Sequence, residues 1–102
     1  MWFMISERLY PLIDSLKPAI KIDLSDLYVF SGPNCLAAEI LKAILDAYGV
    51  EIVALVNDSP DGGVRATVDE DRLEEIIRGG QHMVISLFDG YEHAYAFVKP
   101  PE

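Results

Sequence analysis

The chain has 102 residues, which is the length of one domain. Hydrophobic residues make up 51% of it and charged residues 25%, as in an ordinary globular protein and unlike a disordered one. Lys and Arg number 8 against 17 Asp and Glu, so the formal net charge is −9. This balance argues against a nucleic acid or an anionic membrane as the partner, because both are bound through an excess of basic residues. We expect a peptide or protein as substrate or partner, and so small a core is also compatible with a homo-oligomer.

The single cysteine, Cys35, excludes an internal disulfide and a cysteine-rich zinc module. Lone cysteines are typical of intracellular proteins, and no apolar run approaches the ~20 residues of a transmembrane helix. The apolar residues 1–5 are too few for the core of a signal peptide. We therefore expect a cytoplasmic protein. With two histidines and one cysteine, the sequence offers no metal-ligand spacing, and we expect neither a metal nor another cofactor.

The hydrophobic pattern predicts a succession of helices and strands. A helix within residues 5–17 begins or kinks at Pro11, and residues 19–30 suit either a strand or a helical turn. The clearest element is a helix over residues 33–48, which lies between Gly32-Pro33 and Gly49. Further along, the pattern predicts strands at 50–56 and 64–68, a helix at 69–78, and strands at 82–88 and 91–98.

Asp89-Gly90, between the last two strands, is typical of a two-residue antiparallel hairpin turn, which pairs Ser86 with His93. Together with the other predicted elements, this hairpin indicates the α+β class. We expect one domain over residues 1–102, in which an N-terminal helix and the helix that carries Cys35 pack on a small antiparallel sheet.

Cys35 lies in the first turn of the helix predicted over residues 33–48. On a helical wheel it falls on the polar side with Glu39, Lys42 and Asp46, opposite the apolar stripe. Unpaired backbone N–H groups and the helix dipole stabilise an anion there and lower the pKa of a thiol. We therefore expect Cys35 to be an activated thiol that titrates below the ordinary ~8.5. The alternative is a small apolar residue without special reactivity.

His93 shares one face of the predicted hairpin with aromatic residues and Ser86. Such a face is not a plain solvated surface, and the longest apolar element that could cover it is the helix that carries Cys35. That packing would bring the helix N-terminus to His93, and a Cys–His pair is the minimum for an activated thiol nucleophile. The alternative for His93 is a half-buried side chain bonded to a neighbour.

Several segments resemble papain-like cysteine peptidases, most closely the branch that processes bacteriocin leaders. Residues 32–38, Gly-Pro-Asn-Cys-Leu-Ala-Ala, are similar to the nucleophile helix, which in the family ends in an aromatic residue and Gly, here Tyr48-Gly49. Residues 73–80 resemble the helix before the catalytic hairpin, and residues 84–87 with 93–98 resemble the strands of that hairpin. The resemblance covers roughly residues 30–98 and implies a papain-like fold for the domain.

The same resemblance implies a cysteine hydrolase that acts on a peptide or amide bond. Cys35 would be the nucleophile, which attacks a carbonyl and forms an acyl-enzyme, and His93 would be the general base. The backbone N–H of Cys35 would help to form the oxyanion hole.

The sequence departs from the family pattern at three places. Leu36 stands where the family has Gly, and the family's oxyanion Gln has no counterpart before the cysteine, so Asn34 and Ser31 are the candidates to replace it. The Asp or Asn that orients the catalytic His on a later strand of the family has no match here. The candidates for that role in this chain are Asp89, Glu92 and Glu102.

These departures leave three functions open. The first is the cysteine hydrolase. The second is a catalytically inactive papain-like binding module, which the departures favour. The third is a small acidic inhibitor that mimics a polyanion and blocks a basic partner, as the charge of −9 allows. Salt-sensitive binding that survives Cys35→Ala would distinguish the third function from the first.

Overall fold

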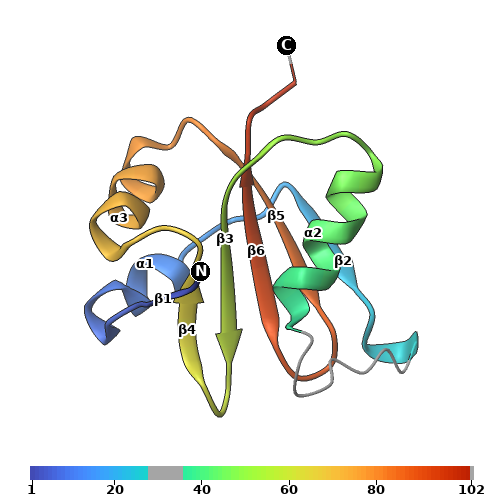
Figure 1. Ribbon diagram of the computed structural model, residues 1–102, viewed down its shortest axis with the longest axis horizontal. Helices are drawn as coiled ribbons and strands as arrows, with labels where there is room; N and C mark the ends of the chain where they lie inside the picture. The colour runs from blue at the N-terminus through green and yellow to red at the C-terminus, as the bar shows by residue number, and fades with distance from the viewer. Residues whose placement is uncertain (28–35, 102) are drawn as a thin grey trace.

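The computed structural model describes residues 1–27 and 36–101, and within them six strands form one mixed sheet in the order β1-β4-β3-β6-β5-β2 (Figure 1). The strands are β1 (Phe3–Met4), β2 (Ile20–Asp23), β3 (Ile52–Ser59), β4 (Gly63–Ala66), β5 (Met83–Phe88) and β6 (His93–Val98). The helices are α1 (Tyr10–Asp14), α2 (Ala37–Ala47) and α3 (Glu70–Gly79), with two 3-10 turns, η1 (Glu7–Leu9) and η2 (Ser25–Leu27).

The sheet confirms the expected α+β class, but it is not the small antiparallel sheet that the sequence predicts. Across the sheet, β4 pairs antiparallel with β1 and β3, and β6 pairs antiparallel with β3 and β5. Only β2 runs parallel to its neighbour among the described strands, which is β5. Parallel neighbours need a long crossover connection, which here passes through α2, β3, β4 and α3. A pairing between strands so distant along the chain has no local signal, which is why the hydrophobic pattern does not predict it.

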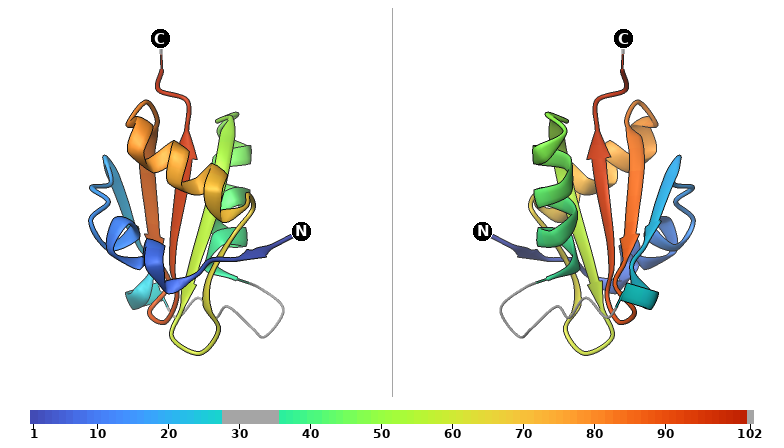
Figure 2. Two further views of the ribbon diagram at one scale, coloured as in Figure 1. Left: turned by 90° about the vertical axis from the view of Figure 1, so that its left-hand side faces the viewer. Right: turned by 90° about the vertical axis from the view of Figure 1, so that its right-hand side faces the viewer.

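The sheet lies between two helical layers (Figures 1 and 2). Residues of α1 and α3 pack on one face, and α2 packs on the other. Strand β6 contributes to both cores because its side chains alternate between the faces. Ala94, Ala96 and Val98 belong to the cluster under α2, whereas Tyr95 and Phe97 belong to the cluster under α1 and α3.

Helix α2 starts at Ala37, later than the predicted start at Pro33, and ends before Gly49 as predicted. Gly49 has a φ of 71°, and the next N–H, that of Val50, donates to the carbonyl of Leu45 at 3.0 Å, which closes the helix end. Neither α2 nor any other helix in the described part of the chain has the length and apolar character needed to cross a membrane.

The N-terminal residues form two short helical segments where one helix was predicted. Pro11 stands in the first turn of α1, where its missing N–H leaves no helical bond unmade. For residues 19–30, both predicted alternatives occur in succession, because strand β2 is followed by the turn η2.

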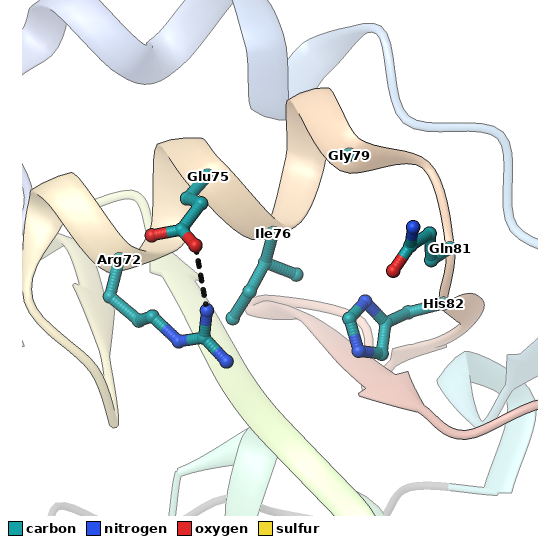
Figure 3. A pocket seen from close by; sticks show the side chains of 6 residues that line it. All are labelled: Arg72, Glu75, Ile76, Gly79, Gln81 and His82. Atoms are coloured by element: carbon teal, nitrogen blue, oxygen red, sulfur yellow. Dashed lines mark hydrogen bonds and ion pairs between the residues drawn. The ribbon is translucent and has the colours of Figure 1, made fainter.

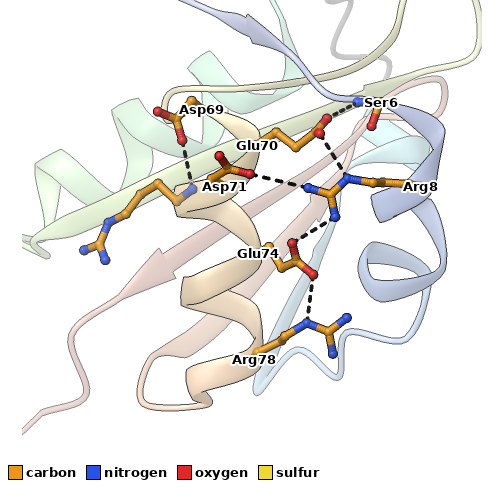
Figure 4. A network of polar contacts seen from close by, with 8 residues as sticks. Ser6, Arg8, Asp69, Glu70, Asp71, Glu74 and Arg78 are labelled. Atoms are coloured by element: carbon orange, nitrogen blue, oxygen red, sulfur yellow. Dashed lines mark hydrogen bonds and ion pairs between the residues drawn. The ribbon is translucent and has the colours of Figure 1, made fainter.

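Arg8 ties η1 to α3 through carboxylates (Figure 4). Its guanidinium donates to Glu70 at 3.1 Å and to Glu74 at 2.9 Å, and Glu70 also accepts the N–H of Ser6 at 2.8 Å. The hydrogen bonds from Ser6, and then the charge of Arg8, lower the pKa of Glu70. Glu70 and Glu74, in the first half of α3, are therefore neutralised by contacts within the protein.

Candidate functional site

The β5–β6 hairpin that carries His93 closes with a longer turn than predicted. The observed pairs are Phe88 with His93, Leu87 with Ala94, and Ser86 with Tyr95. Residues 89–92 therefore form the turn, and Oδ1 of Asp89 accepts the N–H groups of Tyr91 and Glu92 at 2.8 and 2.7 Å. The register differs from the predicted one by two residues, and a shift of two leaves each side chain on its predicted face.

His93 is half-buried on the side of the sheet that α1 covers. Its ring stacks on Tyr95 with 4.6 Å between the ring centroids, and the ring of Phe88 lies 5.8 Å away. On the neighbouring strand β3, Asp58 is the register partner of His93. Burial lowers the pKa of His93, although the charge of Asp58 opposes this shift and that of Lys21 adds to it. Burial therefore favours the neutral imidazole, in which one ring nitrogen can accept a proton.

Two cavities flank His93. The larger has a volume of about 350 Å³ and is lined by Lys21, Ile22, Asp23, Ser86, Phe88 and His93. The smaller has a volume of about 180 Å³ and is lined by Leu16, Pro18, Lys21, Ser86, His93 and Tyr95. The shared residues Lys21, Ser86 and His93 show that both cavities border the same patch of the sheet, across β2, β5 and β6.

Asp58 is a titratable neighbour of His93 that the sequence did not single out. Burial raises the pKa of Asp58, and the negative charge of Asp14 raises it further, while His93 lowers it. The pKa of Tyr95 is raised by burial and then by the same two carboxylates. The sequence pattern missed Asp58 because it predicted that β3 ends at Val56, whereas the strand continues to Ser59.

Two buried polar side chains that are distant in the sequence cap the N-terminus of α2. The N–H of Ala37 donates to Oε1 of Glu92 at 3.1 Å, and the N–H of Ala38 donates to Oδ1 of Asn57 at 2.9 Å. The N-cap residue, Leu36, has no side-chain acceptor, so acceptors from β3 and the β5–β6 turn take that role. These are N–H groups of the kind expected to stabilise a thiolate, and they are already paired.

Helix α2 and His93 lie on opposite faces of the sheet, so the expectation that this helix covers the face of His93 is wrong. α2 packs on Ala94 and Ala96. The physical reason is side-chain size: Ala37 and Ala38 at the start of the helix meet a strand face that is also lined by alanines, which permits a close approach. The aromatic face of the hairpin is too bulky for such contact.

The other predicted site residues fall into two groups. Cys35, Asn34, Ser31 and Glu102 lie outside the described residues, so the pairing of Cys35 with His93 stays a prediction. Asp89 and Glu92 are described and buried, but their carboxylates accept backbone N–H groups of the turn and of α2. No hydrogen bond within the described part of the chain joins either carboxylate to His93.

A third cavity, of about 380 Å³, lies beside the C-terminal end of α3 (Figure 3). It is lined by Arg72, Glu75, Ile76, Gly79, Gln81 and His82. Arg72 donates to Glu75 at 3.3 Å, and Nδ1 of His82 is buried without a hydrogen-bond partner among the residues described. This lining contains no Ser, Thr or Cys side chain. Among residues 1–27 and 36–101, no three His, Cys, Asp or Glu side chains gather in a way that could hold a metal ion.

Comparisons with protein-family models, with curated proteins and with solved structures give no match for this chain.

Replacing Glu92 with Ala is expected to lower the free energy of unfolding by about 1–3 kcal/mol, because the buried N–H of Ala37 loses its acceptor. Glu92→Gln keeps a carbonyl oxygen at that place and should recover most of the loss. Glu39→Ala, which removes an exposed carboxylate from the same helix, is the matched control. Urea denaturation followed by circular dichroism compares the three variants, and equal losses for Glu39→Ala and Glu92→Ala would contradict the capping role.

The pKa of His93, followed by NMR of the ring protons, is expected below the ordinary ~6.5. Asp58→Asn should lower it further, because a charge that favours imidazolium is lost, and Lys21→Gln should raise it, because a repulsion is lost. The unfolded chain takes up this proton at a higher pH than the folded protein. The contribution of His93 to stability is therefore complete above about pH 6.5 and declines as the pH falls below that value. A rise of the pKa of His93 in Asp58→Asn, or a fall in Lys21→Gln, would contradict this account.

Proposed function

We propose that this protein is a non-catalytic binding module that engages a basic surface of a protein partner. The proposal rests on one observation: carboxylates without an ion pair to Lys or Arg gather at one end of the sheet, while most basic side chains are paired elsewhere. It corresponds to the inactive and acidic alternatives that the sequence left open. We also propose a cytoplasmic location, which the lone cysteine favours.

The β3–β4 turn, the β5–β6 turn and η2 lie together at the lower end of the sheet in Figure 1. The hydroxyl of Tyr91 donates to Asp61, which joins the two turns, and a Cβ built at Gly90 would lie 3.6 Å from Ser25 at the start of η2. We call the carboxylates of this region the hairpin-end acids; they are Asp23, Asp26, Asp58 and Asp61. Within the described residues, none of them forms an ion pair with Lys or Arg. They are therefore available to a basic partner.

Most basic side chains are neutralised in other parts of the molecule. The ion pairs are those of Arg8 with Glu70, Asp71 and Glu74, Arg72 with Glu75, Arg78 with Glu74, Lys42 with Asp46, and Lys99 with Glu51. Lys21 and Arg65 are the basic residues close to the hairpin-end acids. The net charge of −9 is thus distributed unevenly, and a cationic partner is attracted most strongly to the hairpin end.

Two observations weigh against catalysis by a papain-like mechanism. The first N–H groups of α2 are bonded to Glu92 and Asn57, and His93 lies on the face that α2 does not cover. The cysteine hydrolase and the papain-like fold remain hypotheses that rest on the resemblance of residues 32–38, 73–80, 84–87 and 93–98 to that family. His93 supports them in one respect, because burial keeps its imidazole neutral and able to accept a proton.

Binding is tested with a fluorescent arginine-rich peptide as the basic probe, at about 50 and about 200 mM salt. Neutralising the hairpin-end acids to Asn should weaken binding at low salt by about tenfold or more, because the local attraction is lost. The matched control neutralises the same number of exposed carboxylates elsewhere: Glu7, Glu39, Asp71 and Glu75. It has the same net charge and should bind nearly as well as the unaltered chain. Equal weakening in both variants would mean that only net charge matters and would refute a site at the hairpin end.

The reactivity of Cys35 separates this proposal from the hydrolase. If the protein is a binding module, Cys35 should alkylate with iodoacetamide at about pH 6.5 no faster than a model peptide thiol. His93→Ala should leave that rate unchanged, and Cys35→Ala should leave peptide binding unchanged. A fast reaction that slows in His93→Ala would overturn the proposal and restore the Cys35–His93 hydrolase.

A further inference from the structure

Strand β2 forms one edge of the sheet (Figure 2). Its neighbour is β5, and no strand within the described residues pairs with its other side. Ile20, Lys21 and Asp23 are exposed, with Ile20 at 48%. An open edge of this kind presents unpaired N–H and C=O groups and is a template for pairing with another strand.

The hydrogen-bonding direction of β2 identifies the residues that face outward. Lys21 pairs with Ser86 and Asp23 with Phe88, and the N–H of Leu24 donates to the carbonyl of Phe88 at 2.8 Å. In a parallel ladder the backbone groups of successive residues point to alternate sides. The N–H and C=O groups of Lys21 and Asp23 therefore point away from β5, toward the open edge.

The two faces of β2 differ in chemistry. Ile22 and Leu24 pack against the cluster under α2, and Ile20 lies on the same face two residues earlier. Lys21 and Asp23 lie on the opposite face, where both line the larger cavity beside His93. The strand thus alternates an apolar face with a face that carries one positive and one negative charge.

This pattern is complementary to itself when two copies run antiparallel with Ile22 opposite Ile22. Lys21 then lies opposite Asp23 of the second copy, and this happens twice because of the two-fold symmetry. Ile20 lies opposite Leu24 of the second copy, so the apolar face also continues across the junction. Registers centred on Lys21 or on Asp23 would instead place like charges opposite each other, which is unfavourable.

We propose that two copies of this chain associate through β2 in this antiparallel register and so join their sheets into one. Charges on an edge strand normally prevent such pairing. Here they alternate in sign two residues apart, so that the same charges select one register. The association needs no other partner and goes beyond the function proposed above. It uses Asp23, which is also one of the hairpin-end acids, so that in the dimer only the other three stay available to a basic partner.

The test is sedimentation velocity of the full chain over a dilution series, together with two charge-reversal variants. Lys21→Asp alone and Asp23→Lys alone each place like charges opposite each other and should weaken dimerisation by about tenfold or more. An equimolar mixture of the two variants restores opposite charges across the junction and should recover the affinity of the unaltered chain. The unfolding midpoint of each variant is checked first, because Oδ1 of Asp23 also accepts from Ser25.

A second measurement uses the unaltered chain alone. Amide hydrogen exchange at Lys21 and Asp23 should slow as the protein concentration rises, because their N–H groups become bonded in the dimer. Exchange at Glu39, which lies on the exposed side of α2, serves as the control. A chain that stays monomeric at every concentration, or a dimer that ignores both charge reversals, would overturn the proposal.

Discussion

The close packing of α2 on the alanine face of β6 is the contact on which the rest of the structure depends. Ala94 and Ala96 are fully buried, and because they are small, the first turn of α2 can lie close to the strand. The larger residues of β6 must then face the other way, where α1 and α3 cover Phe97. One strand in the middle of the sheet thereby decides which helices cover which face, and it leaves His93 on the side that α2 does not reach.

The same packing explains the polar groups buried near the hairpin. Glu92 and Asn57 are nearly inaccessible, and burying such groups without partners would be costly. The N-terminus of α2 has the opposite need, because Leu36 cannot cap it. The helix end supplies N–H donors and the two side chains supply acceptors, so that both sets of buried polar groups are hydrogen-bonded. A carboxylate used in this way is not available to orient His93.

The distribution of charge on the surface depends on which carboxylates form ion pairs with the few Lys and Arg side chains. Arg8 binds the acidic side of α3 and holds η1 against it, which neutralises the densest run of carboxylates in the sequence. Within the described residues, the carboxylates of the turns at the other end of the sheet form no ion pair with Lys or Arg. There Asp58 is partly desolvated, and the charge of Asp14 raises its pKa further. The edge strand β2 differs again, since it carries one charge of each sign. The charge of this acidic protein is therefore distributed unevenly over its surface.

The sequence by itself determined the α+β class, the helix before Gly49, the hairpin and the face on which each hairpin residue lies. These properties depend on local periodicity and turn residues, and they survive even a register error of two. Only the tertiary structure decided that β2 runs parallel to β5, that Glu92 and Asn57 cap α2, and that Asp58 lies beside His93. Each of these joins residues far apart in the chain. The face of the sheet that a helix covers depends on the fit between the helix surface and the sheet surface. The hydrophobic periodicity of the helix sequence describes only the helix surface.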